Sequence, residues 1–372
     1  MEKAKSGQKA DFPEGIEECG TDALRFALVA YTSQARDINL DIKRVVAYRH
    51  WCNKLWNATK FAMKYLPDDF APASSPDTSA YPFFCRWILS CLSRASETTV
   101  QAMERYEFST ATTAVYDFWQ YRLCDVFIEL CKPVMQQEDS SPGAAAAKRA
   151  VQETLWLCLD AGLRLLHPFM PFVTEELWQR LPRRADQAGL QTIMLAPYPA
   201  AVPAWTAPEL EDRMRSLEEV IGKVRSLRVQ YGLTRQRPQL FITCKDAARA
   251  AMLRDSSMEI ATLASTSEVS VLGSGEEPPH GCGVQIVDDA TSVYMMLRGI
   301  LDPQLEIQKL EKKRGEVSGR IEQINKKMAL PGYQDKTPEA VRQQDAEKLS
   351  KTEAELSLVD KAIDDFRRIA LD

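Results

Sequence analysis

The sequence predicts a mainly α-helical protein in three parts: a helical bundle, a small α+β insert and a C-terminal antiparallel coiled-coil hairpin. Three observations support this prediction. Apolar residues recur at the helical period through most of the first 232 residues, short β-branched runs follow, and two heptad segments come last. With 372 residues, 45% hydrophobic and 27% charged, the chain can bury more than one core.

The first part is expected to consist of amphipathic helices separated by breaks. Stretches rich in Pro, Ser and Ala at 67–82 and 136–147, and an irregular stretch at 181–208, supply the breaks. The expected helices lie near 22–33, 41–65, 83–107, 108–136, 147–167, 171–181 and 208–232. Long helices with short connections are typical of a bundle.

The insert and the hairpin follow. Short strands are expected at 239–244, 268–272, 283–287 and 292–297, with a helix near 246–265. The hairpin has heptad positions on both sides of a break at Pro331-Gly332: Ile307, Leu310, Arg314, Val317, Ile321, Ile324 and Met328, then Leu349, Thr352, Leu356, Val359, Ile363, Phe366 and Ala370. The predicted domains are 1–40, a remnant preceding the bundle, then 41–237, 238–302 and 303–372.

Composition excludes several classes of protein. A net charge of −5 argues against a uniformly basic nucleic-acid coat, so any such contact must come from local patches. The nine cysteines show no Cys-x-x-Cys spacing, which predicts reduced thiols of a cytosolic protein, without a zinc site or disulfide framework. No apolar run reaches 18 residues, and the first residues resemble no signal peptide or presequence, so no membrane association is expected.

One helical segment, 41–64, carries six basic residues and one acid. A helical projection places most of its polar side chains opposite an apolar side made of Tyr48, Trp51, Cys52, Leu55, Trp56, Ala58, Ala62 and Met63. Lys, Arg and Asn beside an aromatic ring suit RNA, because phosphates need cations and unpaired bases stack on rings. The alternative is a solvated face with the ring packed under a neighbouring helix. The polar side collects Lys43, Arg49, His50, Asn53, Lys54, Asn57, Lys60, Phe61 and Lys64.

Two other basic segments are weaker candidates for contacts with the RNA backbone. The segment 213–237 includes Arg225 and Arg228, and the first heptad helix includes Lys312 and Lys313. Acidic residues interleave with both sets. A salt-bridged surface is the more common explanation for such a run of arginines on a helix, and a solvated face accounts for the hairpin lysines equally well.

Several phrases, in order, resemble the valine, isoleucine and leucine branch of class I aminoacyl-tRNA synthetases. They are Gly20-Thr-Asp-Ala-Leu-Arg-Phe26, Tyr48-Arg-His-Trp-Cys-Asn-Lys-Leu-Trp-Asn-Ala-Thr-Lys-Phe61, Leu123-Cys-Asp-Val-Phe-Ile-Glu-Leu-Cys-Lys132 and Leu166-His-Pro-Phe-Met-Pro-Phe-Val-Thr-Glu-Glu-Leu-Trp-Gln-Arg180. The terminal hairpin is similar to that of valyl-tRNA synthetases, the animal cytosolic ones in particular. Isoleucyl relatives usually carry a cysteine-rich zinc module there.

The resemblance implies a bundle that binds the anticodon of tRNA(Val), a coiled coil against the outer corner of the tRNA, and a cytoplasmic location. By position, the implied anticodon contacts are Lys54, Lys60 and Phe61 first, then Asn53, Asn57, His50 and Arg49. The family often has Arg where Lys60 stands, and lysine lacks the planar fork of a guanidinium. A further implied partner is the translation elongation factor complex, reached through the full-length enzyme.

Within these phrases, some residues are expected to be structural. His167-Pro168 should end a helix, Met170, Phe172 and Trp178 should lie in the core, and Asp22 should complement the dipole of its own helix.

The resemblance also implies what the chain lacks. The family activates valine with ATP in a domain marked by His-x-Gly-His and Lys-Met-Ser-Lys-Ser signatures, and neither occurs here. We therefore expect no catalytic residue, no metal and no cofactor in this chain; ATP and Mg²⁺ would serve a catalytic core outside it. The chain, as a separated fragment or partial gene model, should neither activate valine nor edit. Two alternatives stay open: a non-enzymatic coiled-coil scaffold and the matching part of an isoleucyl-tRNA synthetase.

Overall fold

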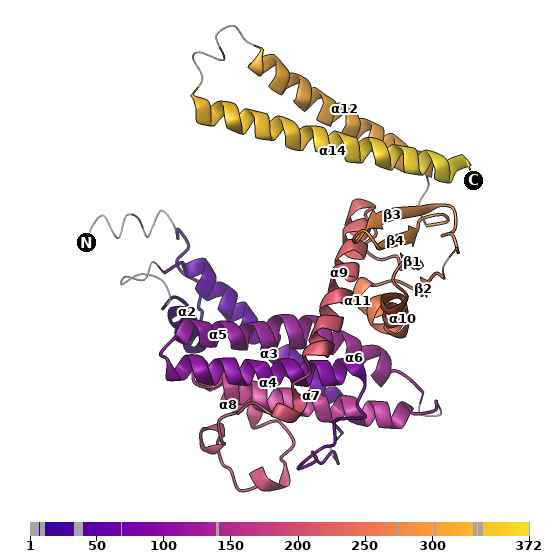
Figure 1. The fold of residues 1–372 in the computed structure, drawn as a ribbon. Helices are drawn as coiled ribbons and strands as arrows, with labels where there is room; N and C mark the ends of the chain where they lie inside the picture. The colour runs from indigo at the N-terminus through magenta and orange to yellow at the C-terminus, as the bar shows by residue number, and fades with distance from the viewer. Residues whose placement is uncertain are drawn as a thin grey trace. The chain divides into compact units, whose positions relative to one another are not determined.

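The computed structural model describes residues 12–32, 40–67, 69–138, 141–273, 275–300, 303–329 and 338–371, together with the single positions 7 and 333. The chain divides into two compact units, residues 1–215 and 216–372, and each is described by itself. Helices dominate and one small sheet is present, so the predicted fold class is confirmed (Figure 1). The predicted boundaries at 237 and 302 both lie inside the second unit.

The first unit is a helical bundle, drawn from indigo to pink in Figure 1. Most helices begin and end within a few residues of the predicted ones. The segment predicted as one helix at 108–136 is three consecutive helical elements, the middle one a π-helix. The elements are α2 (Thr21–Ala30), α3 (Ile42–Tyr65), α4 (Phe83–Glu104), α5 (Phe108–Asp117), η1 (Phe118–Phe127, π), α6 (Ile128–Met135), α7 (Ala144–Leu166) and α8 (Pro171–Trp178).

The core of the bundle is built around large aromatic side chains. Four tryptophans, Trp87, Trp119, Trp156 and Trp178, are almost fully buried. Trp119 lies in η1 and its indole N–H donates to the carbonyl of Gly162 in α7 at 3.0 Å. A Cβ at Gly162 would lie 3.1 Å from the indole ring, so glycine is what allows this close approach.

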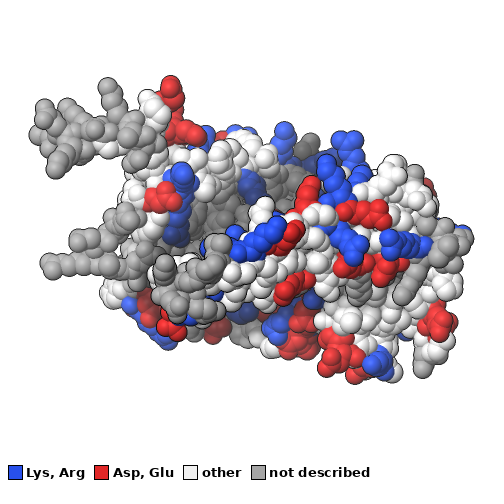
Figure 2. Space-filling model, turned by 90° about the horizontal axis from the view of Figure 1, so that it is seen from above, with Lys and Arg blue, Asp and Glu red and all other residues white. Residues whose placement is uncertain are grey.

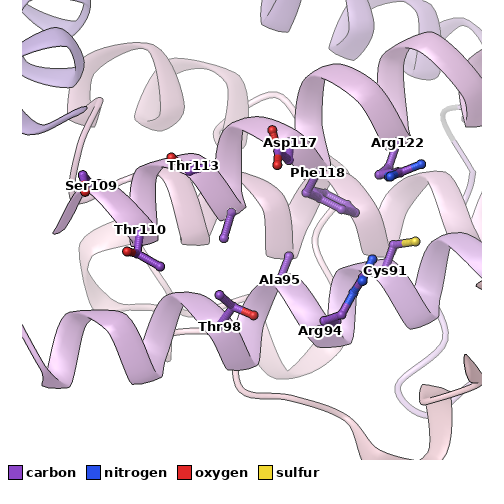
Figure 3. A pocket seen from close by; sticks show the side chains of 11 residues that line it. Cys91, Arg94, Ala95, Thr98, Ser109, Thr110, Thr113, Asp117, Phe118 and Arg122 are labelled. Atoms are coloured by element: carbon purple, nitrogen blue, oxygen red, sulfur yellow. The ribbon is translucent and has the colours of Figure 1, made fainter. Parts of the chain in front are cut away.

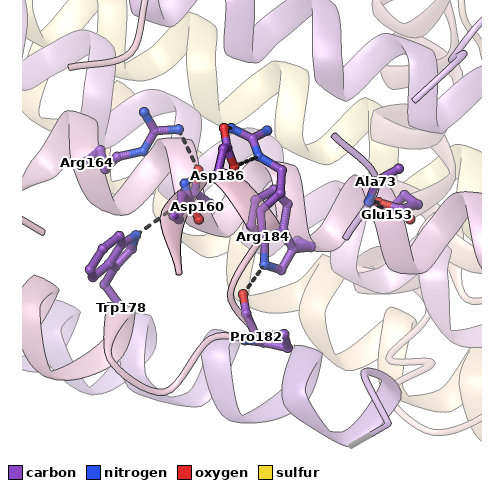
Figure 4. A network of polar contacts seen from close by, with 10 residues as sticks. Ala73, Glu153, Asp160, Arg164, Trp178, Pro182, Arg184 and Asp186 are labelled. Atoms are coloured by element: carbon purple, nitrogen blue, oxygen red, sulfur yellow. Dashed lines mark hydrogen bonds and ion pairs between the residues drawn. The ribbon is translucent and has the colours of Figure 1, made fainter. Parts of the chain in front are cut away.

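The irregular segment 181–208 is fixed to α7 by a buried carboxylate, shown in Figure 4. Asp160 is 2% exposed and accepts from the indole N–H of Trp178 at 2.8 Å and from the amide of Gln187 at 3.2 Å. Arg164 pairs with the same carboxylate and also donates to the carbonyl of Pro197 at 2.7 Å. A buried charge is stable only when paired and hydrogen-bonded, and Asp160 meets that condition.

One expectation about the first unit was incomplete and another was wrong. Asp22 lies in the first turn of α2, where its charge complements the dipole of that helix as expected, but its carboxylate also accepts from the backbone N–H groups of Phe172 at 3.2 Å and Val173 at 2.7 Å, so it caps the first turn of α8. Met170 and Trp178 are buried as expected, but Phe172 is 66% exposed. It follows Pro171 in the first turn of α8, and its backbone N–H donates to the carboxylate of Asp22 in α2.

The second unit begins within α9 (Pro208–Gln230) and contains the sheet. The strands are β1 (Leu240–Cys244), β2 (Val269–Val271), β3 (Cys282–Ile286) and β4 (Thr291–Met296), as predicted, in the order β2-β1-β4-β3. Only β1 and β2 pair in parallel, which requires the crossover through α10 (Ala247–Asp255) and α11 (Ser257–Ala264). The predicted single helix at 246–265 is therefore two, separated at Ser256.

Two long helices, α12 (Pro303–Met328) and α14 (Glu339–Leu371), form the hairpin. Their ion pairs join Glu311 to Arg367, Arg314 to Asp360 and Lys327 to Asp345. As the residue number increases along α12, the number of its partner in α14 decreases, so the two helices are antiparallel, as predicted. The break at Pro331-Gly332 lies outside the described residues.

Burial along the hairpin follows the predicted heptads with one correction. The most buried heptad residues are Ile307, Val317, Ile324, Thr352, Val359, Ile363 and Phe366. The hydroxyl of Thr352 donates a hydrogen bond to the backbone carbonyl of Lys348 at 2.6 Å. Arg314 was expected in the seam, but its side chain is 54% exposed and reaches Asp360 at 2.7 Å. Its long stem allows the charge to leave the seam and remain in solvent.

The nine cysteines are free thiols, six of them buried. Across the described ranges, His, Cys, Asp and Glu side chains nowhere gather in a group that could hold a metal ion. No helix within those same ranges is long and apolar enough to cross a membrane.

Candidate nucleic-acid interface

The helix α3 presents a polar stripe on one side and packs into the bundle on the other. Its N-terminus is capped by Asp41, whose carboxylate accepts from the backbone N–H of Lys43 at 2.9 Å. The buried side is made of Val45, Trp51, Cys52, Leu55, Ala58, Thr59 and Ala62. The exposed positions include five of the predicted contacts, namely Arg49, His50, Asn53, Asn57 and Lys60. The predicted division of the helix into two faces is therefore found, and the predicted contacts share its open side.

Aromatic packing fixes the rotation of α3. Phe26 of α2 lies 5.0 Å from Trp51 and 4.8 Å from Tyr48, measured between ring centroids. Tyr116 of α5 lies 4.8 Å from Trp51. Edge and tilted contacts of this kind are favourable and directional. The polar stripe is thus held outward by a cluster contributed by three helices.

Trp56 departs from the prediction. The helical projection placed it on the buried side, but it is 40% exposed. The guanidinium of Arg180, just beyond α8, lies 5.0 Å from its ring centroid. A cation over an indole face stabilises an exposed ring, so Trp56 belongs to the surface between α3 and α8.

Lys54 is half-buried and already has a partner. Its Nζ lies 2.7 Å from Oδ1 of Asp125 in η1, and the two side chains are 35% and 45% exposed. The other carboxylate oxygen, Oδ2, accepts from the amide of Gln120 at 3.1 Å. The ammonium of Lys54 is therefore held in a defined place while a third of its side chain remains open to a ligand.

Phe61 is half-buried beside a second cation. Its ring lies 4.9 Å from Tyr65 in an edge contact, and Nζ of Lys132 lies 6.0 Å from its centroid. Lys132 is also paired with Glu129 at 2.6 Å. The ring is partly exposed and its position is fixed by these neighbours, and a partly exposed aromatic ring can stack an unpaired base.

Arg49 differs from the rest of the stripe. It lines a hollow of about 440 Å³ between the start of α2, α3 and the start of α8, together with Cys52, Asp22 and Phe172. Burial raises the pKa of the Cys52 thiol to about 11. Arg49 is therefore placed beside the α2–α8 junction, at the end of the stripe away from Lys60.

The weaker predicted contacts have two kinds of surroundings. The guanidinium of Arg225 donates to the carbonyl of Leu263 at 2.9 and 3.0 Å. Arg228 donates to the carbonyls of Gln236 at 2.7 Å and Ser265 at 2.9 Å. Both arginines thus join α9 to the end of α11. Lys312 and Lys313 lie exposed on α12, among acids. Figure 2 shows the same mixing of blue and red side chains on the visible face, without one continuous basic field.

A separate hollow of about 450 Å³ lies between α4 and the α5–η1 segment, and Figure 3 shows its lining. Arg94, Arg122 and Asp117 surround it with hydroxyls from Thr98, Ser109, Thr110 and Thr113. Arg94 is paired with Glu211 at 2.9 Å, and burial raises the pKa of Asp117. Its cations are therefore partly neutralised from within the bundle.

Sequence reasoning did not single out Gln120, Asp125 or Lys132, which adjoin the predicted residues. Asp125 and Lys132 stand inside a quoted phrase, Leu123–Lys132, but helical periodicity could not pair them with α3. The contacts join residues 71 apart, and they depend on the π-helical register of η1.

Two domain families match the chain. Residues 85–243 match an anticodon-binding domain of tRNA ligases, and residues 302–367 match a valyl tRNA synthetase tRNA binding arm. The second match coincides with the coiled-coil hairpin. The chain thus matches two domain families whose names refer to tRNA binding.

Curated relatives agree. Valine–tRNA ligases of Rattus norvegicus and Homo sapiens are each 46% identical over 99% of this chain and 29% of their own length. A mitochondrial valine–tRNA ligase of Arabidopsis thaliana is 41% identical over 96% of this chain and 32% of its own. A solved Agrobacterium radiobacter LeuRS–tRNA complex aligns with a TM-score of 0.36 and 20% identity, over 50% of this chain and 20% of that chain.

The two domain-family matches and the curated relatives identify the class of protein as an aminoacyl-tRNA synthetase, of which this chain is a part. The chain belongs to the valyl-tRNA synthetase family and spans about three tenths of the length of the curated relatives it matches. The resemblance expected from the sequence is thereby confirmed.

Proposed function

We propose that the chain is the tRNA-binding part of a valine–tRNA ligase, and that the open side of α3 reads the anticodon of tRNA(Val). The observation that carries the proposal is the position of Lys54 and Phe61. Each is only partly buried, and each contacts a residue within the anticodon-binding domain match. A fixed cation and a fixed ring on one helix suit a phosphate and a stacked base.

The other members of the stripe supply complementary chemistry. Asn53 and Asn57 each offer an amide acceptor and two donors to base edges, and both are exposed. Lys60 and His50 add donors at the open surface. A lysine at position 60 makes a point contact rather than the paired contact of a guanidinium, so we assign it to a phosphate or a single base atom.

The coiled-coil hairpin is proposed to bind the outer corner of the same tRNA. Its family match names a tRNA binding arm, and Lys312 and Lys313 lie exposed on α12. Acidic residues beside these lysines, such as Glu311, limit the net attraction of the helix for RNA, because their carboxylates repel the negatively charged phosphates. We therefore assign the hairpin a positioning role through shape and a few cations.

The remaining assignments concern the complete ligase. The relatives bear the name valine–tRNA ligase, and this chain spans 29% of the length of the two mammalian proteins compared above. We propose that ATP, Mg²⁺ and valine are handled by parts outside this chain, that the complete protein acts in the cytoplasm, and that it meets the translation elongation factor complex there. The chain alone should not form valyl-adenylate. ATP–pyrophosphate exchange by the purified chain would contradict this.

A binding experiment tests the central proposal. The affinity of the chain for tRNA(Val) transcripts, with and without anticodon changes, is measured across a salt series. We expect affinity to fall with salt, because bound cations release counterions from the RNA, and to fall with the anticodon change. Equal affinity for all tRNAs would leave only an electrostatic surface. Absence of binding would favour a scaffold built on the hairpin.

A further inference from the structure

A ridge of polar side chains runs beside the predicted anticodon stripe. It consists of Gln120 and Asp125 in η1 and Glu129 and Lys132 in α6. Asp125 meets Lys54, and Lys132 lies over the ring of Phe61. Both pairs span 71 residues (125 − 54 and 132 − 61), so the ridge and α3 run in the same direction, side by side. The stripe therefore has a second wall.

The π-helical geometry of η1 sets the position of one carboxylate in this wall, that of Asp125. In an α-helix, residues five apart point about 140° away from each other, since each residue turns the chain by about 100°. In a π-helix, whose hydrogen bonds join residues five apart, they come onto one face. Gln120 and Asp125 are five apart in η1 and are hydrogen-bonded at 3.1 Å. The amide of Gln120 thus fixes Oδ2 of Asp125 while Lys54 fixes Oδ1.

Asp125 has acceptor capacity left. An ionised carboxylate offers about four lone-pair sites, and these two contacts use two of them. Its side chain is 45% exposed, so the free sites face solvent. A carboxylate accepts hydrogen bonds and donates none. It therefore attracts the exocyclic amino group of adenine or cytosine and repels the carbonyl oxygen that guanine or uracil carries at the same ring position.

We infer that Asp125 is a specificity residue of the anticodon site, accepting a hydrogen bond from the exocyclic amino group of a base that stacks near Phe61. The inference rests on the proposed reading of the anticodon by α3. Valine codons begin with G and U, so the matching anticodon letters are C and A, and both carry an exocyclic amino group. Lys54 stays beside the carboxylate and balances its charge against nearby phosphates.

The test is a binding experiment with base swaps that change one group. The full chain and its Asp125→Asn variant are titrated with tRNA(Val) transcripts carrying guanine for the anticodon adenine, or uracil for the cytosine. The wild type should prefer the parent transcript over one swapped transcript by roughly tenfold. The Asn variant should bind those two transcripts about equally, because an amide both donates and accepts.

Controls separate specificity from charge. Glu97→Gln, on the exposed side of α4, removes the same charge and should change all affinities alike, leaving the preference intact. Gln120→Ala frees Oδ2 and should reduce the preference partly. If Asp125→Asn keeps the wild-type preference, the inference is overturned while the proposed function stands. If the wild type itself shows no preference, both are overturned.

Discussion

Lys54 of α3 and Asp125 of η1 form an ion pair with 2.7 Å between Nζ and Oδ1, across 71 residues of sequence. Both side chains are partly exposed, so the pair contributes roughly 0–1 kcal/mol to stability. A pair this weak costs little to loosen when RNA arrives. The ion pair nevertheless restricts the conformations of the Lys54 side chain before RNA binds. Less conformational entropy is therefore lost on binding.

Lys54→Ala should weaken binding to tRNA(Val) by about 1–3 kcal/mol, because a positioned cation at the anticodon is removed. If Lys54 contacts a phosphate, the slope of log affinity against log salt should also fall by about one. Filter binding or fluorescence anisotropy across a salt series measures both. Lys245→Ala, directly after β1 in the second unit, removes the same charge and should have a smaller effect. Similar losses in both variants would contradict a special role for Lys54.

Phe61→Leu should weaken binding by about 1–3 kcal/mol, while Phe61→Tyr should bind nearly as the wild type. Leucine keeps apolar volume but has no π face, whereas tyrosine keeps the ring. Titration with tRNA(Val) transcripts measures the difference. Equal affinity of the Leu and wild-type chains would exclude a stacked base at Phe61 and move the reading surface to another helix.

The helical period of the sequence located the helices and most of the stripe, because both depend on residues close in the chain. It placed Lys60 and Asn57 outward correctly, since both side chains are exposed on α3. The prediction was wrong at Trp56, whose partly exposed ring lies beside the guanidinium of Arg180 from a distant segment. It was also wrong at Phe172, whose backbone N–H donates to Asp22 while its side chain stays exposed. Both errors come from partners that are remote in sequence.

The second wall of the candidate site was beyond sequence reasoning for a different reason. Asp125 and Gln120 point the same way only because η1 is π-helical. No residue pattern in this segment distinguishes a π-helix from the α-helix that was predicted. The packing of Trp119 against Gly162 in the core accompanies this register, and it too is a contact between distant segments.

Asp160→Asn should lower the free energy of unfolding by about 2–4 kcal/mol, because it leaves the largely buried side chain of Arg164, 15% exposed, without its counter-charge. Urea unfolding followed by tryptophan fluorescence measures the change. Asp186→Asn is the matched control: its side chain is 59% exposed and pairs with Arg184, so the loss there should stay below about 1 kcal/mol. Equal losses would contradict a structural role for the buried network.

Buried thiols should make the protein less stable at alkaline pH. Burial raises the pKa of Cys85 and Cys91 to about 12, and that of Cys158 well above its ordinary value of 9.0. Above pH 9 the unfolded chain therefore releases protons that the folded chain retains, and stability falls as pH rises from about 9 toward 12.

Urea unfolding at pH 8, 9 and 10 measures this effect. Because lysines and tyrosines also titrate in that range, the informative quantity is the difference between variants. Cys158→Ala should flatten the pH dependence, because it removes one of the buried thiols. Parallel pH profiles for the wild type and Cys158→Ala would contradict the assignment.

Gly162→Ala should lower the free energy of unfolding by about 1–3 kcal/mol, because the new methyl group would lie 3.1 Å from the indole of Trp119 and must displace it. The indole also donates to the Gly162 carbonyl at 3.0 Å, so the ring cannot move without weakening that bond.

Gly315→Ala in α12 is the matched control, since a Cβ there meets no atom within 4 Å. Replacing a helical glycine that has open space around it by alanine should raise the free energy of unfolding by about 1 kcal/mol. The two substitutions are therefore expected to have opposite signs in urea unfolding. A stabilising Gly162→Ala would show that Trp119 and α7 are less closely packed than the structure indicates.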